Sequence, residues 1–289
     1  MTAEKIMQIF EEWAPATLAE EWDNVGLLIG DVSRTINKVL VALDATEAVI
    51  DEAVKGGFDF LVVHHPLVYN PVKRITTADS VGKKILALVE NKIGCFCAHT
   101  NLDKASGGVS DLLAQKIGLH DIAPLIPESH EVQGLEHNAQ DALLLPPVEI
   151  AERFSSTSQI GIGRVGFLLE EKSLTALAAD IKAALQLSTV RISGDGDKKI
   201  KKIGLCGGDG SGSRYMEAAI AAKCDLYITG DLRYHAVQEA LERGIAFVDI
   251  THYGGEVLVI DAIVSRLRDA VPGLKIFPSS IDAQVFASL

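Results

Sequence analysis

The sequence has no long apolar run. No stretch reaches the roughly 20 consecutive apolar residues that a membrane-spanning helix requires. Residues 1–5 lack the basic and then apolar layout of a signal peptide. We therefore expect a cytoplasmic protein that does not associate with a membrane.

Cysteine is also scarce. The chain has 4 cysteines, none of them in C-x-x-C spacing, and they lie in or beside expected strands: Cys95, Cys97, Cys206 and Cys224. This pattern favours reduced, buried thiols over disulfides or a thiolate metal site.

Acidic residues outnumber basic residues. The chain carries 27 Lys and Arg against 39 Asp and Glu, a net charge of −12, which disfavours binding to the phosphate backbone of nucleic acids. The short basic run at 198–202 is interpreted as a solvated loop entering a strand. No nucleic-acid partner is expected.

What the chain does contain is a large core arranged in alternating strands and helices. It is 48% hydrophobic over 289 residues, which suggests two domains. Strand and helix patterns alternate as in βαβ units, so the fold class is α/β with two similar lobes. We place the first lobe at 1–127 and the second at 128–289, with the segment 250–289 as a candidate to pack back onto the first.

The expected elements follow from hydrophobic periodicity, with Thr2 as the N-cap of the first helix. Strands are predicted at 38–43, 58–63, 93–98 and 245–250, and helices at 47–55, 80–91 and 107–117. The pattern breaks over 118–138, which is read as the crossing into the second lobe. The histidines of that stretch, His120, His130 and His137, are assigned to the surface.

Two adjacent histidines, His64 and His65, follow the buried strand at 58–63, and Pro66 makes the chain turn there. Ligands of open α/β sheets gather beyond the carboxyl ends of such strands. Neutral imidazole is a ligand for zinc, iron, copper and nickel. Metal binding is the leading interpretation, and capping of the strand by hydrogen bonds is the alternative.

Two further segments favour the metal. The strand at 93–98 is followed by His99 and Asp103, and the strand at 245–250 by His252 and Glu256. His252 and Glu256 lie four residues apart, a spacing that can bring both side chains to one side of a turn into a helix. Three strand ends with such residues predict a metal site.

The second lobe repeats the first in sequence. Residues 38–47 can be laid on 204–213, and 53–65 on 219–231 with the same offset. Both segments read strand, helix, Asp, strand and polar pair, which suggests an internal duplication. Two such lobes would face each other across a shared cleft.

For two loops the sequence does not decide between a functional and a structural role. The glycine-rich segment 207–212 could hold a phosphate at a helix N-terminus or form a tight turn. Asp23, Asn24 and Gly26 could touch substrate or form a turn before the first core strand.

Six segments together resemble the Nif-three-like family, whose members are often labelled GTP cyclohydrolase I type 2. They are Trp22–Leu27, Val62–Pro66, His99–Asp103, Gly207–Gly212, Thr229–Asp231 and Thr251–Glu256. The resemblance covers nearly the whole chain, in the short form that lacks an extra domain between the lobes. Asp209 departs from the Ser or Ala of many members and adds negative charge near any phosphate.

The resemblance implies a dinuclear metal centre and a ring-shaped homohexamer. The family's ligands fall on His64, His65, Asp103, His252 and Glu256. The metal identity stays open among zinc, iron, manganese, cobalt and nickel.

The first functional hypothesis is a metal-dependent hydrolase-like enzyme for a small substrate such as a nucleotide, with GTP cyclohydrolase activity suggested by the family label. The competing hypothesis is a metal-binding scaffold or regulatory interaction protein without catalysis. His99, Asp231 and His235 are the candidates for a general acid.

Overall fold

The computed structural model describes residues 1–128 and 159–287, which fold into two compact units. The first unit contains residues 1–108 and 257–287, and the second contains residues 109–256. The boundary expected at 127/128 is therefore not the one along which the chain divides. The C-terminal helix and strand belong to the first unit.

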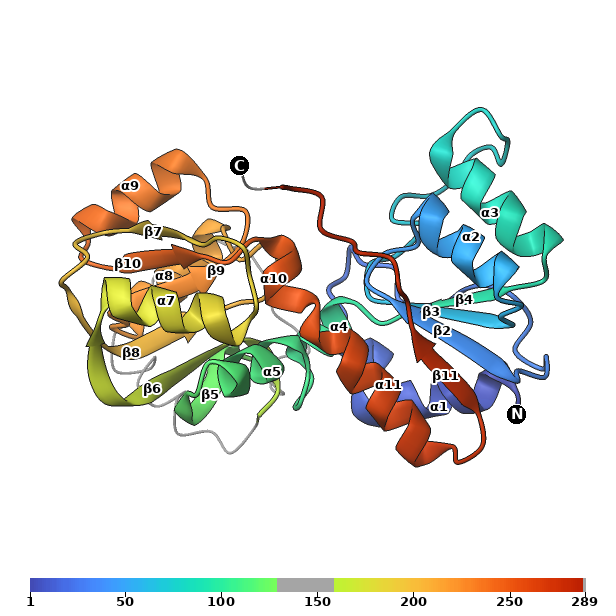
Figure 1. Cartoon of the computed structure of the whole chain (residues 1–289), viewed down its shortest axis with the longest axis horizontal. Coiled ribbons are helices and arrows are strands. Elements are labelled where there is room, and N and C mark those ends of the chain that lie inside the picture. The colour runs from blue at the N-terminus through green and yellow to red at the C-terminus, as the bar shows by residue number, and fades with distance from the viewer. Residues whose placement is uncertain (129–158, 288–289) are drawn as a thin grey trace, which may run out of the picture. The chain divides into compact units, whose positions relative to one another are not determined.

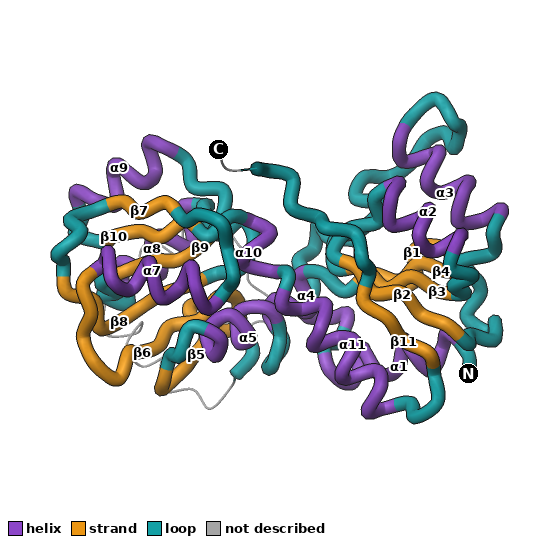
Figure 2. Tube along the Cα trace, viewed as in Figure 1, coloured by secondary structure: helices purple, strands orange, loops and turns teal. Residues whose placement is uncertain are grey.

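The first unit has a five-stranded sheet of order β1-β4-β3-β2-β11, in which only β1 runs antiparallel to its neighbour. Its strands are β1 (Gly26–Ile29), β2 (Lys38–Ala42), β3 (Phe60–Val63), β4 (Gly94–Cys97) and β11 (Lys275–Pro278). Its helices are α1 (Ala3–Trp13), η1 (Ala16–Leu18), α2 (Glu47–Lys55), α3 (Ser80–Glu90), α4 (Thr100–Lys104) and α11 (Leu258–Ala270). Figure 2 shows the strands of this sheet side by side.

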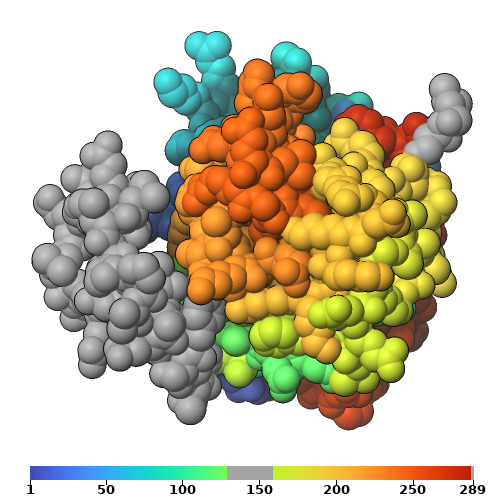
Figure 3. All heavy atoms as spheres, turned by 90° about the vertical axis from the view of Figure 1, so that its left-hand side faces the viewer, coloured from blue at the N-terminus to red at the C-terminus, as the bar shows by residue number. Residues whose placement is uncertain are grey.

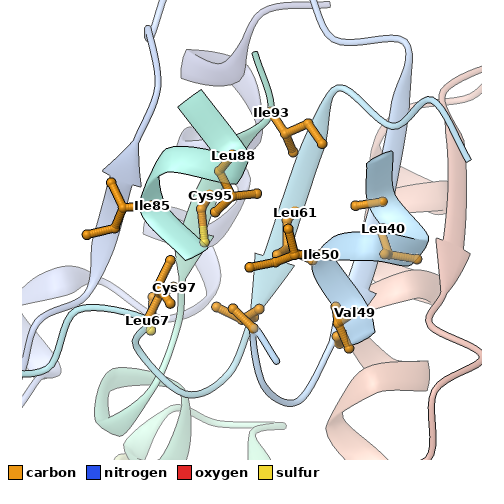
Figure 4. Packing of buried hydrophobic residues seen from close by; sticks show 14 residues of the cluster. Leu40, Val49, Ile50, Leu61, Leu67, Ile85, Leu88, Ile93, Cys95 and Cys97 are labelled. Atoms are coloured by element: carbon orange, nitrogen blue, oxygen red, sulfur yellow. The ribbon is translucent and has the colours of Figure 1, made fainter. Parts of the chain in front are cut away.

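Helices cover both faces of this sheet. α2 and α3 lie on one face, and α1 and α11 on the other (Figure 1). Alternate residues of β2, β3 and β4 pack against α2 and α3, as Leu40, Leu61 and Cys95 do in Figure 4. On the other face Phe10 of α1 contacts Phe96 with tilted rings, whose centroids lie 4.7 Å apart. Strands buried on both faces explain the continuous apolar runs of the sequence.

The second unit has a six-stranded sheet of order β5-β6-β8-β9-β10-β7. Its strands are β5 (His120–Pro127), β6 (Gly161–Ser173), β7 (Arg191–Ser193), β8 (Lys199–Leu205), β9 (Leu226–Thr229) and β10 (Ala246–Asp249). Its helices are α5 (Val109–Lys116), α7 (Leu174–Ala184), α8 (Ser213–Ala221), α9 (Tyr234–Glu242) and α10 (His252–Glu256). Residues of α8 and α9 pack with Tyr227 and Phe247 in one cluster. α9, drawn in orange, lies on the surface of this unit (Figure 3).

The two units repeat one plan, which supports the predicted duplication. In each, three parallel strands stand in the same order beside an antiparallel edge strand, as β1-β4-β3-β2 and as β7-β10-β9-β8. The helices α2 and α8 both have 9 residues. Short helices of 5 residues, α4 and α10, follow the matching strands β4 and β10.

The alignment drawn from sequence needs one correction. Val39 pairs with Phe60 in the first sheet, and Ile203 pairs with Leu226 in the second. The first strands of the repeat therefore match Val39 with Ile203, not with Leu205. The helices α2 and α8 and the strands β3 and β9 keep the predicted offset, so the loop after β8 carries the extra residues.

The stretch 118–138 also differs from its prediction, because residues 120–127 form strand β5. Pro124 and Pro127 obscured it, yet β5 is an edge strand, where a residue without a backbone N–H is tolerated. His120 is exposed on this strand, as expected, and His130 and His137 lie outside the described residues.

All four cysteines are buried and none forms a disulfide. Burial raises the pKa of Cys95 and of Cys224 to about 12, so both thiols stay protonated near neutral pH. The prediction of reduced, buried thiols is confirmed. No helix among residues 1–128 and 159–287 combines the length and the apolar character needed to span a membrane.

Candidate metal centre

His64 and His65 stand at the carboxyl end of β3, whose four residues are all buried. The backbone N–H groups of both histidines donate to Leu43 O, at 3.1 and 2.9 Å. These bonds tie the pair to the end of the neighbouring strand β2. The backbone is therefore fixed where the two imidazoles leave the sheet.

Both imidazoles are also oriented through Nδ1. His64 Nδ1 lies 2.8 Å from Ala98 O, and His65 Nδ1 lies 2.9 Å from Asp44 Oδ1. These oxygens accept hydrogen bonds, so Nδ1 carries the proton and Nε2 carries the lone pair. Metal-binding histidines are held in this way by a carbonyl or a carboxylate.

Two more donors come from the β4 end of the same unit. Asp103, on α4, has Oδ1 3.5 Å from His64 Nε2. His99 precedes α4, and one ligand nitrogen each of His64, His65 and His99 lie within 4.8 Å of one another. The first unit thus gathers three imidazoles and one carboxylate.

Asp23 holds His99 from the opposite side. Its Oδ1 lies 2.9 Å from His99 Nδ1, and its Oδ2 accepts from the backbone N–H and the hydroxyl of Thr100 at 3.0 and 2.5 Å. Burial alone would raise the pKa of Asp23, but the hydrogen bonds from His99 and Thr100 outweigh burial and lower that pKa. Asp23 is therefore a carboxylate at neutral pH, and its side chain is fully buried.

The second unit brings His252 and Glu256 together on α10. His252 Nε2 lies 3.1 Å from Glu256 Oε2, as the spacing of four residues predicted. His252 Nδ1 lies 2.8 Å from Asp231 Oδ2, so this imidazole also presents Nε2. Glu256 is only 4% exposed, although a buried carboxylate is costly unless it is paired or binds a cation.

The glycine-rich loop after β8 packs against this pair. A Cβ on Gly208, which has φ +62°, would lie 2.0 Å from Glu256 Oε1. Within the loop, the Gly210 N–H donates to Thr229 Oγ1 at 2.9 Å, and the Ser211 N–H donates to Asp209 Oδ1 at 3.1 Å. Two loop donors are thus engaged inside the unit, which favours the tight turn over a phosphate cradle.

The donor spacing fits a divalent metal ion. Two ligands at about 2.1 Å from a tetrahedral ion stand about 3.4 Å apart. The imidazole and carboxylate pairs measure 3.5 Å in the first unit and 3.1 Å in the second. Nitrogen and oxygen donors of this kind suit zinc, iron, manganese, cobalt and nickel.

The remaining sequence candidates have other surroundings. His235 is exposed at the start of α9, with its ring 5.1 Å from that of Tyr234. Asp231 contacts His252, which makes it a positioning residue for that imidazole. Sequence reasoning missed Asp44, although it comes two residues after β2 and so also stands at the carboxyl end of a strand.

Histidine and carboxylate donors stand at the ends of parallel strands in both α/β units, and within the described residues they form groups that could hold a metal ion. The sequence model of the family Duf34/NIF3 (NGG1p interacting factor 3) matches residues 1–284. The chain belongs to this family, as the resemblance predicted.

Curated relatives share most of their length with this chain. A GTP cyclohydrolase 1 type 2 homolog of Clostridium perfringens is 34% identical over 269 residues, which are 93% of this chain and 92% of the relative. The protein of the same name from Lactococcus lactis is 32% identical and covers 96% of both chains.

Solved structures agree with this fold. A Bacillus cereus protein related to NIF3 has a TM-score of 0.86 and 26% identity, covering 100% of this chain and 99% of the other. Reduced HcgD from Methanocaldococcus jannaschii has a TM-score of 0.75 and 30% identity, covering 97% and 98%. The mixed α/β fold with two sheets is therefore the fold of the family.

Proposed function

We propose that this protein is a dinuclear metal-dependent hydrolase that acts on a small substrate of nucleotide type. The proposed ligands are His64, His65, Asp103, His252 and Glu256, which would hold two divalent ions. A cytoplasmic location is part of the same proposal.

The observation that carries the proposal is the shared orientation of the ligand histidines. In His64, His65 and His252, Nδ1 is engaged by a carbonyl or carboxylate oxygen at 2.8 to 2.9 Å. A strand-capping histidine has no need for this arrangement in three separate places. The arrangement supports metal binding because it presents Nε2 of each imidazole as a ligand atom. Nε2 of His64 and of His252 lies 3.5 and 3.1 Å from a carboxylate oxygen.

Bound divalent ions would supply Lewis acidity and lower the pKa of water near a carbon or phosphorus centre. The chain's own residues supply the positioning. Asp44 and Asp231 hold the imidazoles of His65 and His252, and Asp23 holds that of His99. His99 stands beside the ligands of the first unit and is our candidate for moving a proton.

The second candidate is a metal-binding scaffold without catalysis. It is favoured by the family description, which names an interacting factor. Both candidates need the same ligands, so metal content alone does not separate them.

Turnover separates them. Protein purified without a histidine tag is loaded with each candidate metal and incubated with GTP and with a metabolite extract. We expect a product that is lost in His65→Ala and kept in His120→Ala, a matched change at an exposed histidine of β5. Equal metal binding with no product from any metabolite would favour the scaffold.

Assembly is a further part of the proposal. The resemblance to the family implies a homohexamer in which the metal sites face an internal cavity, so that only small substrates enter. Light scattering at micromolar concentration tests it, with a mass six times that of the 30.9 kDa chain as the expected result. A monomer under these conditions would contradict the assembly.

A further inference from the structure

Two aromatic side chains are exposed beside the first unit's histidines. Trp22 is 55% exposed and Tyr69 is 52% exposed, and their ring centroids lie 5.8 Å apart at 48°. Trp22 also meets His99 edge to face, with centroids 6.2 Å apart. A row of rings therefore runs from Tyr69 through Trp22 to the imidazole cluster.

The neighbours of Trp22 in sequence have structural tasks. Asp23 is buried against His99 and Thr100, and Asn24 Nδ2 donates to Val68 O at 2.6 Å. Asp23 thus ties this loop to the end of β4, and Asn24 ties it to the segment that carries Tyr69. Of the loop residues left open by the sequence, Asp23 and Asn24 are anchors that fix where Trp22 stands.

Two large rings that stay exposed to water do not contribute the favourable free energy that their burial would give to folding. Aromatic rings dominate the energetics of cores and interfaces, and two neighbouring rings held exposed on anchored segments can serve as a contact surface. The rings are too close for a third ring to fit between them, since stacking on both sides needs about 7 Å between centroids. A ligand ring would instead lie on the open face of Trp22.

We propose that Trp22 and Tyr69 form a stacking platform that binds the planar heteroaromatic ring of the substrate next to the metal ligands. The proposal deepens the proposed function and rests on it for the chemistry at the ring, although binding to the platform needs no metal. Every nucleobase offers a π-face to such a platform. His99 connects the two parts, because its ring lies 5.3 and 5.5 Å from those of His64 and His65.

The chain offers its own probe of this surface. It has only 2 tryptophans, and Trp13 is 8% exposed with its indole N–H bonded to Ser106 O. In Trp13→Phe the emission therefore reports Trp22 alone. Guanosine monophosphate and ribose 5-phosphate form a matched pair of ligands, with and without the ring.

We expect guanosine monophosphate to quench Trp22 in Trp13→Phe, with excitation beyond nucleotide absorption, and ribose 5-phosphate to leave the emission unchanged. Calorimetry should show a Kd raised about 5- to 100-fold in Trp22→Ala, since base stacking on one aromatic ring has that magnitude. Tyr69→Ala should raise it less. Tyr234→Ala, at a 77% exposed tyrosine of the second unit, should leave it unchanged.

Three results would overturn the platform: equal binding of both ligands, an unchanged Kd in Trp22→Ala, or a Trp22→Ala variant that loses its oligomeric state while nucleotide binding persists. The last would make the rings an interface between copies of the chain. Repeating the titration after chelation separates this proposal from the metal site. Ring binding that survives in metal-free protein supports the platform, even where metal-loaded protein shows no turnover.

Discussion

In the first unit β3 is followed by His64 and His65, whereas the matching strand β9 of the second unit is followed by Gly230 and Asp231. The next strand of each unit leads into a short helix with a carboxylate, Asp103 on α4 and Glu256 on α10. The backbone plan is shared, but the first unit gathers three imidazoles and the second contributes His252.

The comparison shows how a repeated scaffold acquires unequal roles. Where the first unit has His65, the second has Asp231, which holds His252 through Nδ1. The same strand end thus carries a proposed ligand, His65, in the first unit and a residue that orients another proposed ligand, His252, in the second. Metal binding should therefore be more sensitive to changes in the first unit than in the second.

The largest effect is expected from His65→Ala. Loss of a support for a ligand lowers metal affinity about 10- to 100-fold, so loss of the ligand itself should exceed that. The side chain of His65 is partly exposed, so the fold should persist. Metal titration followed by calorimetry measures the affinity. An affinity equal to that of His120→Ala would remove His65 from the site.

Gly208→Ala should come next. Its Cβ would meet Glu256 Oε1 at 2.0 Å, so the carboxylate must move away from His252. Gly57→Ala is the matched control, because Gly57 has the same φ of +62° and nothing within 4 Å of the added carbon. Both variants carry the backbone strain, about 1 kcal/mol in unfolding free energy, and only Gly208→Ala should also lose metal. Equal metal content in both would contradict the role of the loop.

The supporting carboxylates should have smaller effects. Asp44→Asn and Asp231→Asn each replace the charged partner of an imidazole with an amide. We expect metal affinity to fall about 10- to 100-fold at most. If metal affinity depends more on the first unit, Asp44→Asn should lower it more than Asp231→Asn does. The reverse order, measured by competition with a chromogenic chelator, would overturn the ranking of the two units.

The smallest effect concerns Asp23 and pH. Its pKa is lowered in the folded protein, so it stabilises the fold above the unfolded value of about 3.9, and this contribution fades as pH falls below that value. Urea unfolding should therefore show the advantage of wild type over Asp23→Asn shrinking from pH 5 to about pH 2. Asp31→Asn, at an exposed aspartate, should show a smaller change. A gap that widens at low pH would contradict the assignment.

Much of the fold and of the candidate site could be predicted from the sequence, because strand ends and buried strands have recognisable residue patterns. The β3 run and the histidines after it, the spacing of His252 and Glu256, and the repeat of α2 in α8 were all visible in one sequence. The pairing of β11 with β2 was not, since only tertiary contacts bring residues 275–278 beside 38–41.

The supports of the site were harder to predict than its ligands. Asp44 and Asp23 lie far in sequence from the histidines they hold, so spacing gives no signal for either contact. Trp22 was seen as part of a family motif, but its exposure depends on the anchors on either side of it. Strand ends in the sequence therefore predict the proposed metal ligands, but they do not predict the residues that orient those ligands.

We propose that each chain holds two metal ions through His64, His65, Asp103, His252 and Glu256. Elemental analysis of untagged protein, saturated with metal and then desalted, should give about two ions per chain. Glu256→Gln should lose about one of them while circular dichroism and oligomer size stay unchanged, because the amide cannot neutralise two adjacent cations. One ion per chain in saturated wild type, or both ions retained by Glu256→Gln, would contradict the account.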